Sequence, residues 1–392
     1  MRQPATGIAA VPLFSYGFRP FFLAAAGWAA AAMVLWIGTV TGLWTIAAHY
    51  GPVAWHAHEL LFGYVAAAIT GFLLTAIPNW TGRLPVKGGP LLALALLWAA
   101  GRLAMLFSDW IGTVPAAAID SLFLVALALT IVREVVAGKN WRNLKTVGLV
   151  SALAIANIGY HAETILYGAP DYAMRAAIAL IIGLIMLIGG RIIPSFTRNW
   201  LAQQGAARLP TPFGRTDVGL IAVAAVALAA WVVFPETAIT GILLLIAAVA
   251  HAFRLSRWAG LSTWRQPLVF VLHAGYAFVP FGFLTVGLSI LSPGFFPPTG
   301  ALHAWTAGAI ALMTLSVMTR ATLGHTGRAL SAGGPTVGIY LAALVAVLTR
   351  LAAALLPAHA MPFLDLAGLA WIGCFAGYVV VYGPMLVGPR KV

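Results

Sequence analysis

The chain has 392 residues, of which 62% are hydrophobic and only 8% are charged. Soluble domains carry about a quarter charged residues, so this composition excludes an ordinary soluble protein and indicates a chain that lies in a bilayer. The formal net charge of +13 would suit a nucleic-acid partner, but the basic residues stand between apolar segments, where they set membrane topology instead.

Apolar segments of about 20 residues follow one another along the chain, and each is long enough to cross the hydrocarbon as a helix. Strands of a membrane barrel would be about half as long and would alternate in polarity, which excludes a barrel. We therefore predict an all-α, polytopic membrane protein of about twelve transmembrane helices in a single domain over residues 1–392. The predicted helices lie near residues 20–42, 58–78, 90–107, 113–133, 146–168, 174–193, 218–234, 237–254, 268–291, 302–320, 336–356 and 363–387.

The basic residues follow the positive-inside rule when the N-terminus is placed inside. From Arg2 to Lys391, all but three of the 22 lysines and arginines then fall on inner ends or inner loops. Both termini are therefore predicted to be cytoplasmic. The basic loops serve topology and contact with anionic lipid, so the expected partner is the lipid bilayer and no nucleic acid.

The second predicted helix opens with Trp-His-Ala-His-Glu, which places His56, His58 and Glu59 at its outer end. Residues two apart on a helix point about 200° apart. Either His56 precedes the helix and folds over, or the two histidines serve different centres. Glu59 shares a face with His56, where a carboxylate orients a ligand ring or passes protons to a buried site.

Further histidines lie at the same predicted depth, His161 in the fifth helix and His303 in the tenth. Four imidazoles on one level predict a metal-ligand set of His56, His58, His161 and His303. The alternative for each is a ring that hydrogen-bonds a neighbouring helix. Glu163 is either a proton carrier or a hydrogen-bonded group at a wet vestibule.

The only cysteine, Cys374, lies in the last predicted helix. This excludes a disulfide within the chain, a cysteine-based zinc or iron–sulfur site and covalently attached haem. Clustered imidazoles without cysteine suit haem iron and copper, so the expected cofactors are haem, of the non-covalent b type, and copper. Zinc accepts the same ligands but supplies no redox chemistry.

A second group of candidate residues lies toward the inner surface. His251, His273 and His325 predict a second centre that relays electrons. Four inner arginines could pair with haem propionates, because the guanidinium forms a bidentate fork with carboxylates. Their alternative role is topology alone. These four are Arg19, Arg191, Arg320 and Arg328.

A short repeat relates the second and tenth helices. From His58 to Arg83 and from His303 to Arg328 the chain runs 25 residues, and both stretches end in Thr-Gly-Arg. A glycine also stands five residues after each histidine. The repeat predicts that His58 and His303 face one shared site.

At the level of whole motifs the sequence resembles the NnrS family of haem- and copper-containing membrane proteins. The resemblance is distributed along nearly the whole chain. It is carried by YGFRPFF (16–22), WHAHELLFGY (55–64), GFLLTAIPNWTG (71–82), GGRIIPSFTRN (189–199) and HAWTAGAIALMTLSVMTRATLGHTGR (303–328).

The resemblance implies a role in denitrification and in resistance to nitric oxide, with haem and copper bound by buried histidines in the bacterial inner membrane. The expected function is binding of NO at an outer metal site and reduction of two NO to N₂O, as in a nitric oxide reductase-type oxidoreductase. Glu59 and Glu163 would supply protons, and a quinol or a cytochrome would donate electrons. The alternative is a non-enzymatic transporter of a metal or metal complex, or a haem- or copper-binding sensor.

Overall fold

The computed structural model describes residues 7–294 and 296–391. Arg2, counted above among the inner basic residues, lies outside them. The described residues form helices and loops without strands, and twelve helical segments are long and apolar enough to cross a membrane. The predictions of an all-α fold and of twelve membrane spans are confirmed. The single domain over residues 1–392 and the cytoplasmic termini stay predictions.

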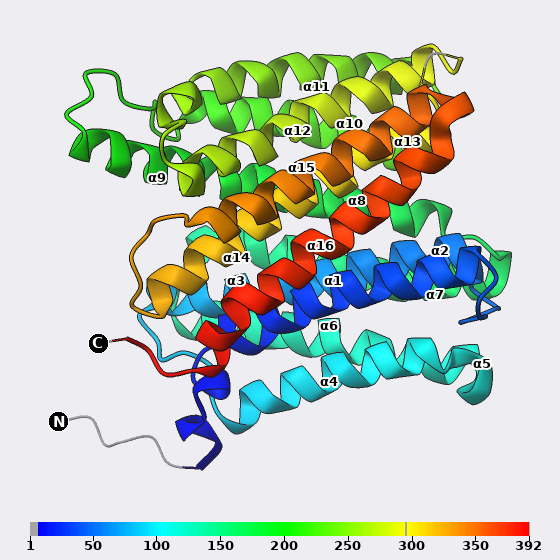
Figure 1. Cartoon of the computed structure of the whole chain (residues 1–392), viewed down its shortest axis with the longest axis horizontal. Coiled ribbons are helices and arrows are strands. Elements are labelled where there is room, and N and C mark those ends of the chain that lie inside the picture. The colour runs from blue at the N-terminus through cyan, green and yellow to red at the C-terminus, as the bar shows by residue number, and fades with distance from the viewer. Residues whose placement is uncertain (1–6, 295, 392) are drawn as a thin grey trace. The chain divides into compact units, whose positions relative to one another are not determined.

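The chain divides into two compact units, whose boundaries fall inside helices α8, α14 and α16 and in the loop between α14 and α15. Unit 1 comprises Met1–Ala177, Met318–Ala329 and Phe375–Val392, and unit 2 comprises Ile178–Val317 and Leu330–Cys374. Figure 1 shows the helices of both units, coloured along the chain.

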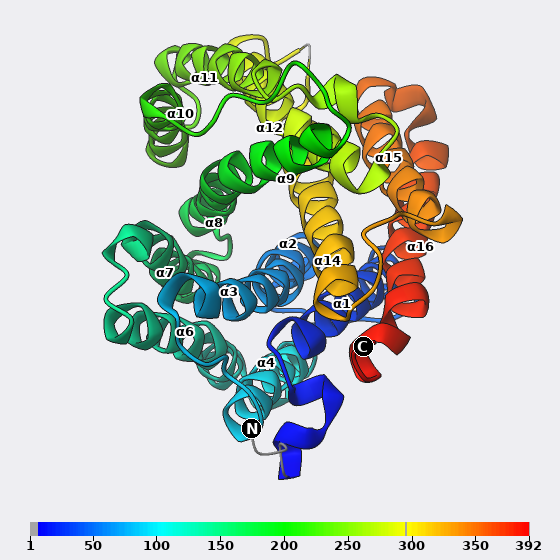
Figure 2. The same cartoon turned by 90° about the vertical axis from the view of Figure 1, so that its left-hand side faces the viewer.

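Unit 1 contains the first five spans. In it α4 packs on α6, α6 on α7, and α1 on α3 (Figure 2). Its helices are α1 (Phe18–Val40), α2 (Gly51–His58), η3 (Glu59–Val65), α3 (Ala66–Thr81), α4 (Gly89–Leu106), α5 (Ser108–Ile111), α6 (Thr113–Ala137) and α7 (Leu144–Tyr167), with the short 3₁₀ helices η1 (Gly7–Ala10), η2 (Pro12–Phe14) and η4 (Trp141–Asn143).

Unit 2 contains helices that pack in sequence order, α10 on α11 and α11 on α12, while α15 packs on α13 and η7. The helices from the boundary onward are α8 (Asp171–Leu184), η5 (Ile185–Gly189), α9 (Gly190–Gln203), α10 (Arg215–Val233), α11 (Ala238–Ser256), η6 (Gly260–Thr263), α12 (Pro267–Leu291), α13 (Pro298–His303), η7 (Ala304–Ile310), α14 (Ala311–His325), α15 (Gly334–Leu355), η8 (Pro357–His359) and α16 (Ala360–Val387).

Three spans contain a π-helix, namely η3, η5 and η7. A π-turn bonds each N–H to the carbonyl five residues back, which widens the helix and leaves carbonyls to be satisfied from outside it. Such turns occur frequently at functional sites. In this chain η3 begins directly after His58, and η7 begins directly after His303.

The second span begins and ends where its sequence provides the signals. Pro52 stands at the start of α2, where a missing N–H costs nothing. The helix then continues through η3 and α3, and Gly82 ends it in the left-handed conformation with φ 70°. His56 and His58 therefore both lie within α2, and they point to different sides of it.

Candidate functional site

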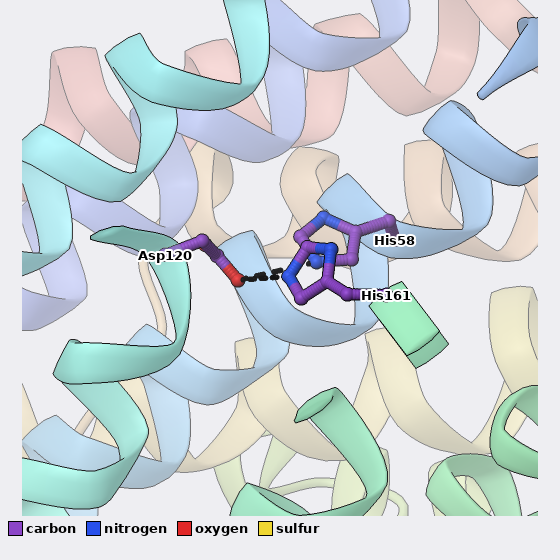
Figure 3. Close-up of side chains that lie close together, drawn as sticks. All are labelled: His58, Asp120 and His161. Carbon is purple, nitrogen blue, oxygen red and sulfur yellow. Dashed lines mark hydrogen bonds and ion pairs between the residues drawn. The ribbon is translucent and has the colours of Figure 1, made fainter. Parts of the chain in front are cut away.

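The most buried group of polar side chains in unit 1 lies where α2, α6 and α7 meet. His58 is the last residue of α2, Asp120 lies in α6 and His161 lies in α7. Figure 3 shows that the three side chains come from three helices and point toward one another. All three are buried, with at most 2% of each residue exposed.

These three side chains offer a set of ligand atoms for one ion. The Nε2 atom of His161 lies 2.9 Å from Oδ2 of Asp120, and Nε2 of His58 lies 3.3 Å from the same oxygen. One ligand atom from each residue can be chosen so that all lie within 4.8 Å of one another. Two imidazole nitrogens and a carboxylate oxygen at this spacing form a candidate metal centre.

Asn157 fixes the orientation of these groups. Its Nδ2 donates to Asp120 Oδ2 at 2.8 Å, while its Oδ1 lies 3.1 Å from Nε2 of His58. The opposite orientation of the amide would set two oxygens against each other, so the hydrogen-bond pattern selects the one observed. Asn157 precedes His161 by one helical turn and therefore presents its side chain on the same face of α7.

Each histidine is also held through its second ring nitrogen. Tyr50 Oη lies 2.8 Å from Nδ1 of His161, and Glu59 Oε1 lies 2.9 Å from Nδ1 of His58. Burial, together with the charges of Asp120 and Glu59, raises the pKa of the Tyr50 phenol. The phenol therefore keeps its proton, and its oxygen can accept a hydrogen bond from Nδ1–H of His161, the tautomer that leaves Nε2 free as a ligand. Metal-binding histidines are usually oriented by such a partner on the second nitrogen.

Arg102 in α4 ties the two carboxylates together. Its Nη1 donates to Glu59 Oε2 at 2.5 Å, and its Nη2 donates to Asp120 Oδ1. Trp28 adds a second donor to Glu59, from Nε1 at 2.7 Å. Two carboxylates face one guanidinium, and both ring nitrogens of His58 face oxygen acceptors, so a second positive charge, either a protonated His58 or a bound cation, balances the cluster in a site removed from water.

The π-helix η3 makes room for this arrangement. A Cβ on Gly63 would lie 2.6 Å from Nη1 of Arg102 and 2.7 Å from Nε1 of Trp28, so only glycine fits there. The carbonyl of Gly63 accepts a hydrogen bond from Trp98 Nε1 at 2.9 Å. Gly63 therefore has two roles: its carbonyl accepts a hydrogen bond from outside the π-helix, and its missing side chain leaves room for Arg102 and Trp28, which bind Glu59.

Of the residues predicted for the outer site, the structure brings His58, His161 and Glu59 together. His56 faces elsewhere: its ring packs on Trp36 with centroids 4.3 Å apart. Glu163 accepts hydrogen bonds from the backbone N–H groups of Tyr172 and Ala173, at the start of α8. These bonds match the hydrogen-bonded alternative for Glu163, and its role as a proton carrier stays a prediction.

His303 belongs to unit 2, where its Nδ1 lies 2.6 Å from the carbonyl oxygen of Thr299. That contact requires Nδ1 to carry the proton and to donate it. A site shared with His58 stays a prediction.

Among the inner candidates, His251 and His273 lie in unit 2. Nδ1 of His251 lies 2.9 Å from Tyr276 Oη, and Nε2 of His273 lies 2.7 Å from Thr197 Oγ1. A Cβ on Gly260 would lie 2.5 Å from Nδ1 of His273, so that nitrogen is packed against backbone.

His325 lies in unit 1 instead, where it stacks on Tyr16 with ring centroids 5.9 Å apart. Three of the four inner arginines, Arg19, Arg320 and Arg328, lie in unit 1 too. Arg19 donates to the carbonyls of Leu386 and Gly388, at 2.7 Å each. Arg328 donates to the carbonyl of Thr326 at 3.3 Å.

Arg191 lies over the ring of Phe213 in unit 2, with the guanidinium carbon 5.7 Å from the ring centroid. Arg320 lies in α14 and is half-buried. Their pairing with haem propionates, like that of the other two arginines, stays a prediction.

Sequence reasoning missed four residues of the site: Tyr50, Arg102, Asp120 and Asn157. Asp120 had the clearest signal, because a carboxylate in the middle of an apolar span is costly and marks a functional position. Arg102 is one of the three basic residues that do not follow the positive-inside rule, and the same cost of a charge in the bilayer marks it. Asn157 could have been found by its spacing, one turn before His161.

The comparisons with known proteins agree with the motif resemblance. A family model described as "NnrS protein" matches residues 12–390, which is nearly the whole chain. No curated protein matches the chain.

Proposed function

The chain belongs to the NnrS family of nitric-oxide-related membrane proteins, and from this premise we propose that unit 1 binds nitric oxide at a redox metal held by His58, Asp120 and His161. The observation that carries the proposal is the convergence of these three buried side chains from separate helices. The protein is a multi-pass membrane protein, and we propose the bacterial inner membrane with both termini cytoplasmic.

The residues present fit a transition-metal ion. Two imidazoles and a carboxylate are common ligands for such ions, and the carboxylates outnumber the guanidinium beside them. A redox ion supplies electrons to a bound NO molecule. The motif resemblance implies haem and copper for the buried histidines, without assigning either to a particular one.

The surrounding residues prepare the donors before an ion arrives. Arg102 and Asn157 hold the Asp120 carboxylate, and Tyr50 holds the ring of His161. This second layer of hydrogen bonds fixes ring tautomers and orientations, which raises the affinity of a metal site.

Aromatic rings exclude water from the site. The rings of Phe62 and Tyr160 lie 5.2 and 5.3 Å from that of His58, between centroids. Nitric oxide is small and nearly apolar, so it can reach a buried site through the bilayer. Charged or bulky molecules would be excluded by the same rings.

We further propose that the chemistry is the reduction of two NO to N₂O and water, with two electrons and two protons. Within the site, Tyr50 Oη holds a proton on Nδ1 of His161, and Glu59 lies on the opposite side of the cluster next to His58. Glu59 remains the proton-path candidate. A quinol or a cytochrome would donate the electrons.

Haem is part of the family expectation, but it enters no step of this proposal. Nδ1 of His251 and Nε2 of His273 are occupied by Tyr276 and Thr197. His325 belongs to the other unit. A second centre held by these three residues stays a prediction.

A fixed redox site is favoured over metal transport by the way the donors are held. A transport site must release its cargo, and it typically lies near the bilayer midplane between broken helices. Here the ligands are locked by Arg102, Asn157 and Tyr50 in a buried cluster.

The test compares purified protein with the variant His58→Ala in lipid nanodiscs, under anaerobic conditions with a chemical reductant. We expect wild type to bind NO, seen as a change in its visible or EPR spectrum, and to release N₂O. His58→Ala should lose both by at least tenfold, because it removes one of three ligands.

The matched control is His49→Ala, since His49 is exposed. It should behave as wild type. Equal NO binding in wild type and His58→Ala would overturn the proposal. A wild-type protein that carries metal ions into vesicles without binding NO would support the transporter instead.

A further inference from the structure

The loop between α1 and α2, residues 41–50, ends at Tyr50, whose side chain lies directly on the His58–Asp120–His161 cluster. We infer that this loop is a strap that has to open before a metal ion can enter or leave the cluster. The inference rests on the proposed function, because it concerns access to the same metal site.

The three candidate ligands are buried close to one end of unit 1. His58 lies seven residues after the start of α2, Asp120 lies seven after the start of α6, and His161 lies six before the end of α7. At 1.5 Å of rise per residue, each ligand is about 10 Å from that end of its helix. Since at most 2% of each is exposed, part of the protein must move before an ion can reach them.

Tyr50 covers the cluster on the side of this helix end. Its Oη lies 2.8 Å from Nδ1 of His161, and its ring centroid lies 5.8 Å from that of His161 and 6.4 Å from that of His58. Only 3% of Tyr50 is exposed, whereas His49 beside it is exposed. An ion that arrives from this surface therefore has to displace the Tyr50 side chain.

The rest of the strap has the properties of a segment that opens locally. Seven of its ten residues are exposed and none of the ten is helical. Such segments open at a much lower cost in free energy than a packed transmembrane helix does. The indole Nε1 of Trp44 donates to the carbonyl of Leu35 at 2.8 Å, and the N–H of Ala48 donates to Oδ2 of Asp109 at 2.9 Å. These two hydrogen bonds tie the strap to α1 and α5.

Ala47 adds backbone strain to the closed strap. Its φ of 48° lies in the left-handed region, which alanine rarely adopts. The residue is fully buried in an apolar cluster with Tyr50, Trp55 and Met105, and its carbonyl accepts the N–H of Tyr50 at 2.9 Å. A strained backbone persists only where its surroundings hold it. Packing therefore holds the strap closed against a strain that opening would relieve.

The experiment locks the strap shut with a cross-link. Ala48→Cys combined with Asp109→Cys places two thiols at exposed positions that contact each other, while the chain's own cysteine, Cys374, is buried. A short bismaleimide joins the two thiols. The matched control is the same double variant capped with N-ethylmaleimide, which leaves the strap free.

Copper(II) is the probe, because among the divalent first-row ions it binds nitrogen and oxygen sites most tightly. It is added to metal-free protein in lipid nanodiscs, and its uptake is followed by EPR. Release into excess EDTA is followed by mass spectrometry of the copper that stays with the protein. Copper that His58→Ala also binds is subtracted as surface binding.

We expect the cross-linked protein to take up and release copper at least about tenfold more slowly than the capped control. Copper loaded before cross-linking should remain bound with an unchanged EPR spectrum, because the lock acts on access and not on the ligands. Asp109→Ala removes the acceptor for Ala48 and should speed release several-fold. Asp365→Ala, at an exposed acidic residue of unit 2, should not change the rate.

The outcomes separate the strap from the metal site. Equal exchange rates in cross-linked and capped protein, with copper held at the cluster, overturn the strap and leave the metal site intact. Loss of preloaded copper on cross-linking also contradicts the strap. Wild-type protein that holds no more copper than His58→Ala overturns the metal site of the proposed function itself.

Discussion

Single residues decide how the cluster is held, and Gly63 is the most constrained of them. Arg102 and Trp28 donate to Glu59 through the space that a side chain on Gly63 would fill. A buried ion pair stripped of one partner costs about 3–5 kcal/mol, so displacement of Arg102 would be felt by both carboxylates. Gly63 is therefore required because it leaves space for the side chains of Arg102 and Trp28.

Gly63→Ala tests this directly. Overpacking of a tight contact costs about 1–3 kcal/mol, so we expect a lower thermal midpoint in detergent and less bound metal. Gly27→Ala in α1 is the control, because a Cβ there meets nothing within 4 Å. That change should leave the midpoint equal or slightly higher, since alanine favours helices. Similar midpoints and metal contents for both variants would contradict the account.

At the scale of helices, the spans were predictable because apolar length alone defines them. His58, His161 and Glu59 were predictable because titratable groups in such spans are rare. The π-helix η3 was not predictable, since nothing in Glu59–Val65 distinguishes a π-turn from an α-turn. Which helices are neighbours was not predictable either, and Arg102 and Asp120 enter the site only through the packing of α4 on α6.

A substitution of Glu163 tests whether this carboxylate only stabilises the start of α8 or also carries protons. Its oxygens accept the N–H groups of Tyr172 and Ala173, so Glu163→Ala should cost about 1 kcal/mol, as loss of a helix cap does. We expect metal content and N₂O release to remain within twofold of wild type. A tenfold loss of N₂O release at full metal content would show instead that Glu163 carries protons.

For the whole molecule, the repeat seen in the sequence has a counterpart in the backbone of two spans. Gly82 and Gly327 both end a span in the left-handed conformation, with φ 70° and 74°. A Gly-Gly-Pro motif follows each and opens the next helix, α4 in unit 1 and α15 in unit 2. The copies diverge at the site, because Glu59 and Arg102 correspond to alanine and valine in the second copy. Only the first copy retains the ion pair between Glu59 and Arg102.

The topology prediction also concerns the whole chain. With both termini cytoplasmic, a fluorescent protein fused after the last residue should be bright, and alkaline phosphatase at the same point should be inactive. A fusion in the loop between α4 and α6, near Asp109, should show the reverse. An active phosphatase at the C-terminus would contradict the positive-inside assignment.

The widened turn after His58 has a consequence for how this span can change over generations. A π-turn accommodates one extra residue, and each residue of a helix adds about 100° of rotation. Loss of a single codon between Glu59 and Val65 would leave the span long enough for the bilayer. It would nevertheless swing the whole inner half, from Ala66 to Thr81, round to new neighbours. One deletion can thus change which helices the second part of the span contacts. A helical-wheel assignment that assumes 3.6 residues per turn across the π-helix would also place the residues after it on the wrong face.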